Sequence, residues 1–168
     1  MGNSGDSRII VGEKQAGGGV KGVPLSEDHK PDNAEEKARI ERAGGFVEEN
    51  RVKGILNLSR SLGDMEYKKD PRLKPEDQMI TCVPETQVFN LTSETSFILL
   101  ACDGIWDCLT NQEAADLMHQ RLTSRKSTEK LSTIVGDMFD KIIASSVATS
   151  GGIGCDNMTA ILVKFHNA

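Results

Sequence analysis

The hydrophobic and polar positions of this chain predict an α+β protein in which short strands alternate with helices. Two apolar runs, residues 7–11 and 20–25, flank a glycine triplet, which is typical of an antiparallel hairpin. A third run, residues 97–102, is apolar or small until it reaches Asp103, and we expect a strand that is covered on both faces. Residues 158–165 predict the last strand.

The first predicted helix, residues 34–43, is mostly polar. Asp32 and Glu35 have the spacing of a capping box at its start. Because only four of its positions are apolar, we expect this helix to lie on the surface and not in a core.

Two further helices have a clear apolar face. Residues 110–113, Thr-Asn-Gln-Glu, predict a capping box that opens the first of them. Residues 131–142 repeat apolar side chains at helical spacing, which predicts a long amphipathic helix packed on the core. The apolar face of the helix that begins at 110–113 consists of Ala114, Ala115, Met118 and Leu122.

The middle of the chain predicts short strands with tight loops. Residues 46–47 and 55–58 have strand character on either side of a turn at 48–53. After a charged loop, residues 79–82 and 86–91 have strand character again.

Two acids stand at the ends of predicted strands. Asp103 follows the strand 97–102, and Asp156 precedes the strand 158–165. If these strands are antiparallel neighbours, both carboxylates lie at one edge of the sheet. Carboxylates without imidazole or thiolate partners favour a hard cation such as Mg²⁺, Mn²⁺ or Ca²⁺. Asp107 is within reach of the same site if the turn that separates it from Asp103 is helical.

Composition narrows the functional classes. The 168 residues are 38% hydrophobic and 27% charged, which predicts one domain with a core. A net charge of −5 without a basic patch argues against nucleic acid and anionic membranes as partners. The chain shows neither a membrane span nor a signal peptide, so we expect an intracellular protein, of the cytoplasm or nucleus.

Three other chemistries fit less well. The four cysteines lack Cys-x-x-Cys spacing, so we expect buried free thiols and not a zinc site from Cys102, Cys108 and Cys155. A haloacid-dehalogenase-like phosphatase needs a nucleophilic Asp two residues before Asp103, where this chain has Ala101. A structural Ca²⁺ module needs the spaced acids of a dedicated loop, which are missing.

Six short motifs are spread over nearly the whole chain: Asn3-Ser-Gly-Asp-Ser-Arg8, Asp28-His-Lys-Pro31, Ala43-Gly-Gly45, Leu58-Ser-Arg-Ser-Leu-Gly-Asp64, Ala101-Cys-Asp-Gly-Ile-Trp-Asp107 and Asp156-Asn-Met-Thr159. In this order they resemble the C-terminal part of PP2C-type metal-dependent Ser/Thr protein phosphatases, the PPM family. Gly154-Cys-Asp-Asn-Met-Thr159 and Ile55-Leu-Asn-Leu-Ser-Arg60 are most similar to its gamma-type branch.

The resemblance implies a fold, a metal centre and a substrate class. The fold would be a PP2C-like β-sandwich of two antiparallel sheets flanked by helices. Asp103 and Asp156 match ligands of the family's binuclear Mg²⁺/Mn²⁺ centre, and Asp107 matches a position associated with a third metal. In the family a metal-activated water hydrolyses phosphoserine and phosphothreonine in proteins. Arg8 and Arg60 match structural motifs and not phosphate ligands.

The chain also departs from the family pattern. The Asp-Gly-His-Gly-Gly motif of the family's N-terminal half, with its bridging aspartate, is missing. We therefore expect residues 1–168 to be the C-terminal portion of one catalytic domain, with a fold incomplete at its N-terminal side and inactive alone. Unpaired sheet edges predict self-association. The alternative function is a catalytically silent pseudophosphatase or binding module.

Overall fold

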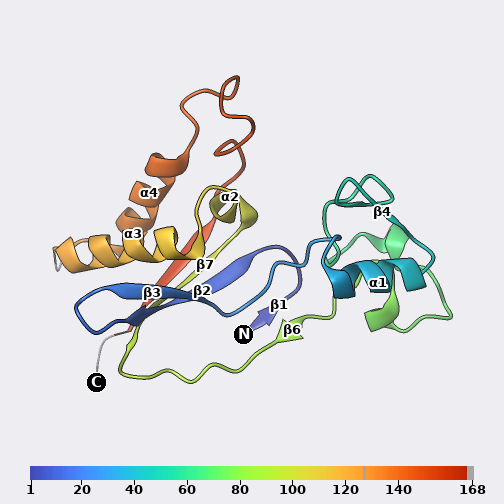
Figure 1. The fold of residues 1–168 in the computed structure, drawn as a ribbon, viewed down its shortest axis with the longest axis horizontal. Coiled ribbons are helices and arrows are strands. Elements are labelled where there is room, and N and C mark those ends of the chain that lie inside the picture. Colours follow the sequence, from blue (N-terminus) through green and yellow to red (C-terminus); the bar gives the residue numbers. More distant parts are fainter. Residues whose placement is uncertain (127, 166–168) are drawn as a thin grey trace. The chain divides into compact units, whose positions relative to one another are not determined.

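The chain forms two compact units, and each is described by itself (Figure 1). The computed structural model describes residues 1–126 and 128–165. Unit 1 comprises Met1–Ser7 and Glu27–Gln87, and unit 2 comprises Arg8–Ser26 and Val88–Ala168. Both contain antiparallel sheets and helices, as expected for an α+β protein.

Unit 2 is built on a four-stranded sheet in the order β3-β2-β7-β8, with all neighbours antiparallel. The predicted hairpin is confirmed, because β2 pairs with β3 around the glycine-rich turn. The strands are β2 (Arg8–Lys14), β3 (Val20–Pro24), β7 (Thr95–Ala101) and β8 (Ala160–Lys164).

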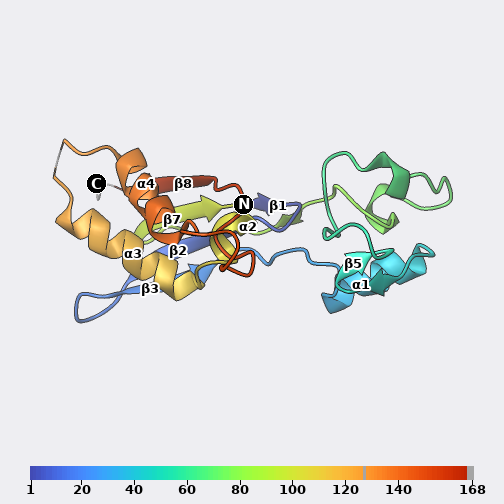
Figure 2. The same cartoon turned by 90° about the horizontal axis from the view of Figure 1, so that it is seen from above.

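Helices α3 (Asn111–Ser124) and α4 (Leu131–Ile142) lie over the same face of this sheet (Figures 1 and 2). The capping box of α3 is confirmed: the Thr110 hydroxyl accepts from the Glu113 N–H, and the Glu113 carboxylate accepts from the Thr110 N–H. The predicted apolar faces of both helices are buried in one core with the inner side chains of the sheet, among them Ile10, Phe97, Leu99, Met118, Ile134, Met138 and Leu162.

The opposite face of the sheet differs from our expectation that the strand at 97–102 is covered on both faces. Burial along β7 alternates strictly, with Phe97 and Leu99 fully buried and Ile98 and Leu100 only partly buried. On β8, Ile161 is 59% exposed. Helices cover only one face of the described sheet. The apolar side chains of β7 that point toward the other face are therefore only partly buried.

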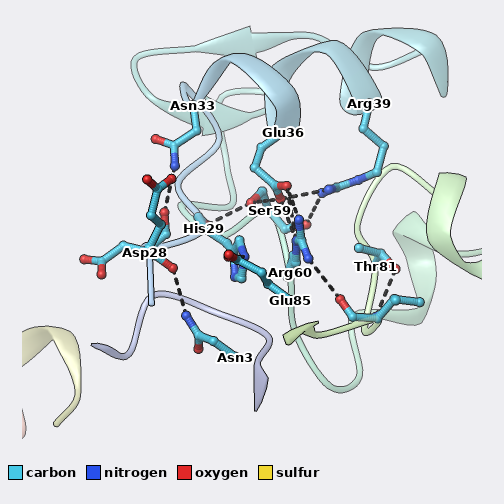
Figure 3. Close-up of polar contacts among 12 residues, drawn as sticks. Asn3, Asp28, His29, Asn33, Glu36, Arg39, Ser59, Arg60, Thr81 and Glu85 are labelled. Carbon is cyan, nitrogen blue, oxygen red and sulfur yellow. Dashed lines mark hydrogen bonds and ion pairs between the residues drawn. The ribbon is translucent and has the colours of Figure 1, made fainter. Parts of the chain in front are cut away.

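Unit 1 has a small apolar core beside a buried polar network (Figure 3). The core consists of Ile40, Val52, Met79 and Ile80. Its secondary structure is α1 (Ala34–Arg42), two single-turn helices, η1 (Met65–Tyr67) and η2 (Pro75–Asp77), and the strands β1 (Gly2–Asn3), β4 (Val47–Glu48), β5 (Arg51–Val52) and β6 (Glu85–Thr86).

Helix α1 corrects two of our expectations. Its N-cap is Asn33, without a side-chain cap, so the predicted capping box of Asp32 and Glu35 does not form. The helix also does not lie wholly on the surface, because one of its faces buries Glu36 and Arg39 together with Ile40. Polar side chains can be buried when each finds a partner, and a pattern of apolar positions does not detect such a face.

The Glu36 carboxylate is the centre of the polar network. It accepts from Arg39 Nη1 at 2.8 Å, from Arg60 Nη2 at 2.6 Å and from Ser59 Oγ at 2.5 Å. Arg39 also donates to the Ser59 carbonyl, and Arg60 Nη1 to the Val83 carbonyl at 3.2 Å. Burial by itself raises the pKa of Glu36, but the hydrogen bonds from Arg60, Ser59 and Arg39 more than offset this and hold the pKa at about 2.

The predicted strands of unit 1 are mostly shorter than expected. Strand β4 pairs with β5 around a two-residue turn, so β5 lies within residues 48–53, where we expected only a turn. Residues 55–58, where we expected the second strand, make one bridge, through Leu56. Residues 79–82 form no strand, and β6 includes only the first residue of the run 86–91. One isolated parallel bridge between Arg60 and Thr81 and the buried side chains of Met79 and Ile80 hold this segment in place.

Candidate metal centre

The pairing of β7 with β8 brings the predicted acids to one end of the sheet. The two strands are antiparallel, and Ala101 pairs with Ala160 at the last register position. Beyond it, the Cys102 N–H donates to the Thr159 carbonyl at 3.1 Å. Asp103 begins the short helix α2 (Asp103–Trp106), and Asp156 lies in the loop that leads into β8.

Gly104 brings these two segments close together. A Cβ atom at this position would lie 2.3 Å from the Asn157 carbonyl oxygen and 3.5 Å from Asp156 Cβ. Only a residue without a side chain allows the start of α2 to approach the 156–157 backbone this closely. Asp156 therefore lies directly beside the turn that carries Asp103.

Cys102 holds the same two segments together. Its Sγ donates to the Asn157 carbonyl at 3.3 Å and accepts from the Thr159 N–H at 3.2 Å. The four cysteines are free, as expected, but none is fully buried: Cys82 and Cys155 are exposed, and Cys102 and Cys108 are partly buried. The proximity of Cys102 to Asn157 could not be deduced from its sequence position.

The three candidate acids differ in exposure. Asp103 is partly buried, whereas Asp107 and Asp156 are exposed. The Asp156 Oδ1 accepts from the Asn157 N–H at 2.6 Å. The turn between Asp103 and Asp107 is helical, and the Asp107 N–H donates to the Asp103 carbonyl at 2.8 Å. The condition under which Asp107 would come within reach of the site is therefore met.

Arg8 and Trp106 fix helix α2 in place. The indole Nε1 of Trp106 donates to the Ala101 carbonyl at 2.7 Å, and the Arg8 guanidinium lies over the indole ring, 5.1 Å from its centre. Arg8 Nη1 also donates to Asn111 Oδ1 at 2.7 Å. These contacts agree with a structural role for Arg8. Arg8, Trp106 and Asn111 also line a pocket of about 410 Å³, whose lining includes Asp107.

The candidate ligands are of the chemical type that binds a hard dication, but too few of them are grouped together. The candidate ligands are carboxylates, which Mg²⁺ and Mn²⁺ prefer. Within residues 1–126 and 128–165, however, no three His, Cys, Asp or Glu side chains are grouped closely enough to hold a metal ion. The described residues thus include candidate carboxylate ligands but no complete ligand group.

Comparison with known proteins identifies the family. A sequence model described as Protein phosphatase 2C matches residues 1–150. The chain belongs to this family. Two similar PP2C proteins are Probable protein phosphatase 2C 60 of Arabidopsis thaliana, 46% identical over 98% of this chain, and Protein phosphatase 2C homolog 2 of Schizosaccharomyces pombe, 46% identical over 97% of it. The chain spans 43% and 42% of the lengths of these PP2C relatives.

Solved structures agree with the PP2C assignment. A phosphatase from a pathogenic strain of Toxoplasma gondii matches 99% of this chain with a TM-score of 0.79 and 35% identity, over 48% of its own length. A sex determining protein of C. elegans matches 96% of this chain with a TM-score of 0.73 and 28% identity, over 35% of its own length. The arrangement of antiparallel strands and helices in this chain is therefore that of PP2C structures.

Proposed function

We propose that this chain is the C-terminal portion of a PP2C catalytic domain, which hydrolyses phosphoserine and phosphothreonine in proteins with the help of Mg²⁺ or Mn²⁺. The observation that carries the proposal is the β7–β8 register, which brings Asp103 and Asp156 to one end of the sheet in a member of this family. The gamma-type branch and a location in the cytoplasm or nucleus are parts of the same proposal. Among the described residues, no helix is long and apolar enough to cross a membrane.

The chain's own residues would position the metals. Asp103 and Asp156 would hold the dications of the binuclear centre through their carboxylates, and Asp107 a third ion. When bound, a hard dication supplies an activated water for the hydrolysis of a phosphate ester. Gly104 and Cys102 keep the 156–159 segment against the start of α2, so that the two acids stay close. Trp106 and Arg8 prevent α2 from turning away.

Two observations support the proposal that this portion of the domain has little phosphatase activity alone. The chain covers less than half of its PP2C relatives, and the described part has no three grouped ligand side chains. With two carboxylates a dication would be held largely through water, which predicts weak binding. The lack of a complete ligand group also favours the second candidate, a catalytically silent binding module.

Mn²⁺ binding and phosphatase activity test the proposal together. We expect Mn²⁺, followed by electron paramagnetic resonance, to bind with a Kd no lower than about 10⁻⁴ M, because few carboxylates contribute. Asp103→Asn should raise the Kd about tenfold, the effect of losing roughly 1.4 kcal/mol of binding free energy. Hydrolysis of p-nitrophenyl phosphate by the chain alone should stay at background with or without Mn²⁺.

Asp140→Asn is the matched control. Asp140 is exposed on α4, and its substitution removes the same negative charge. It should leave Mn²⁺ binding unchanged. If Asp103→Asn and Asp140→Asn bind Mn²⁺ equally, Asp103 is not a ligand and the proposed centre is wrong. Mn²⁺-dependent turnover that Asp103→Asn abolishes would support the phosphatase and overturn its inactivity as a portion.

We also propose that the chain self-associates through its sheet. Strand β8 is an edge strand with a neighbour on one side only within the described sheet, and it exposes Ile161 and Val163 on the uncovered face. Unpaired edges and exposed apolar faces promote pairing with a second chain. We expect sedimentation velocity to show a dimer or larger species, and Ile161→Lys to shift it toward the monomer.

Val88→Lys provides the comparison for this experiment. Val88 is 89% exposed but lies outside the strands, so a lysine there adds the same charge without touching the sheet. It should leave the sedimentation profile unchanged. A wild-type chain that sediments as a single monomeric species would disprove self-association.

A further inference from the structure

Unit 1 contains an acidic pocket that the proposed phosphatase chemistry does not use. The pocket has a volume of about 620 Å³ and is lined by residues from before α1, from α1 itself, from the 59–60 segment and from β6. Its charged and titratable lining residues are Glu27, His29, Glu35, Glu36, Arg60 and Glu85. Figure 3 shows His29, Arg60 and Glu85 gathered beneath the helix that carries Glu36.

The charges of this pocket do not balance within unit 1. Arg60 is committed to both oxygens of Glu36 and to the Val83 carbonyl. In the part of the chain that the structure describes, no cation pairs with the exposed carboxylates of Glu27 and Glu35. The lining of the pocket therefore has more hydrogen-bond acceptors than donors.

His29 adds a buried nitrogen to this surplus of acceptors. The side chain is 4% exposed, and its Nδ1 lies 3.0 Å from the Gly5 carbonyl and 3.3 Å from the Gly5 N–H. One nitrogen cannot both donate and accept, so we assign the proton to Nδ1 on the shorter contact. In the neutral ring Nε2 is then an acceptor, and it is buried without a hydrogen-bond partner.

Two acceptors consequently face one another. His29 Nε2 lies 3.3 Å from Glu85 Oε2, and the Glu85 side chain is 45% exposed. A lone pair against a carboxylate is unfavourable unless a donor satisfies both. The remaining carboxylates of the pocket call for further donors and for positive charge.

A guanidinium group matches this lining better than a metal ion does. No three of these side chains converge closely enough to ligate a metal within the described residues. A guanidinium is planar, carries five N–H donors and stays charged, so it can reach acceptors that are spread over a pocket wall. We propose that this pocket binds the side chain of an arginine presented by a partner protein, with Glu27, Glu35, Glu85 and His29 Nε2 as acceptors.

Titration of the ¹⁵N-labelled chain with N-acetyl-arginine-N-methylamide tests this site by NMR. We expect the Gly5 and Asn33 amide signals and the His29 ring signals to shift with a Kd of about 1–10 mM, as is reasonable for one side chain. The combined variant Glu35→Gln and Glu85→Gln should raise the Kd at least about tenfold, because two charge-assisted contacts are lost.

Glu41→Gln is the control, because Glu41 is exposed on α1 but does not line the pocket. It should bind like the wild type. The neutral citrulline analogue should cause no shifts, and free L-arginine should bind more weakly than the blocked form because its own carboxylate meets the acidic lining. All variants contain only exposed substitutions, and their spectra report whether they fold.

Four results would overturn the arginine site itself. They are the absence of shifts with the arginine probe, equal binding of citrulline, an equal loss of binding in Glu41→Gln, and a His29 ring that is protonated on both nitrogens at pH 7.5 before any probe is added. Tighter binding of free L-arginine than of the blocked form would assign the pocket to a small metabolite and overturn the partner protein as its occupant. The readout does not depend on phosphatase activity, so failure of the proposed function leaves this test intact.

Discussion

Glu36→Ala is expected to lower the free energy of unfolding by about 3–5 kcal/mol, the usual effect of removing one partner of a buried ion pair. The Glu36 and Arg39 side chains are only 4% and 7% exposed, and Arg60 is 17% exposed. Without the carboxylate, two guanidinium groups stay buried without their counter-charge. Urea denaturation measures the change, and hydrogen exchange of the unit 1 amides locates it.

The matched control is Glu41→Ala on the exposed side of the same helix. It removes an equal charge and side chain of α1 and should change stability by less than about 0.5 kcal/mol. If both substitutions have the same small effect, the network around Glu36 does not stabilise unit 1.

The network also predicts the direction of a pH dependence. The pKa of Glu36 is about 2 in the folded chain and 4.5 without the fold. A carboxylate with a depressed pKa stabilises the folded state above its unfolded pKa, and the stabilisation disappears as pH falls through the folded value. Stability should therefore fall between pH 4.5 and about pH 2 by roughly 3 kcal/mol more in the wild type than in Glu36→Gln.

Gly104→Ala is expected to have the second-largest effect, because it separates the two halves of the candidate metal centre. The new Cβ would lie 2.3 Å from the Asn157 carbonyl oxygen, and backbone cannot move as a flexible side chain can. Overpacking of this kind usually lowers the free energy of unfolding by about 1–3 kcal/mol. Thermal denaturation measures the loss, and Mn²⁺ titration should show weaker binding although no candidate ligand has changed.

Gly136→Ala is the internal comparison, because a Cβ at this position of α4 meets no atom within 4 Å. Alanine has the higher helix propensity, so this substitution should raise the free energy of unfolding by up to about 1 kcal/mol. If Gly104→Ala is as stable as the wild type and binds Mn²⁺ equally well, the close approach of α2 to the 156–157 backbone does not organise the site.

The elements of unit 2 could be predicted largely from the sequence. A hairpin, a capping box and an apolar stripe are local patterns, and β2, β3, α3 and α4 follow them. The antiparallel pairing that brings Asp103 and Asp156 to one sheet end was predicted as a condition, and the β7–β8 register meets it. The six motifs predicted the PP2C family, which the comparisons confirm.

Unit 1 was predicted poorly for a physical reason. Its short strands and the buried face of α1 depend on partners that are distant in the sequence, such as Arg60 for Glu36 and Gly5 for His29. Apolar periodicity does not report a polar face that hydrogen bonds bury. Residues 79–82 have strand composition, but their pairing is limited to one isolated bridge between Thr81 and Arg60, and Met79 and Ile80 are buried in the core of unit 1.

The sequence by itself therefore determined the family and the helices and hairpin of unit 2, and it indicated the carboxylates of the metal centre that we propose, because motifs, caps and periodicity are encoded in neighbouring residues. Tertiary structure decided which acids lie at one end of the sheet and which charges are buried. It decided that Gly104 allows Asp156 to approach α2, that Glu36 is enclosed by two arginines, and that His29 Nε2 faces Glu85 in an acidic pocket. These outcomes arise from contacts between remote segments, whose energies depend on distances that the order of residues does not specify.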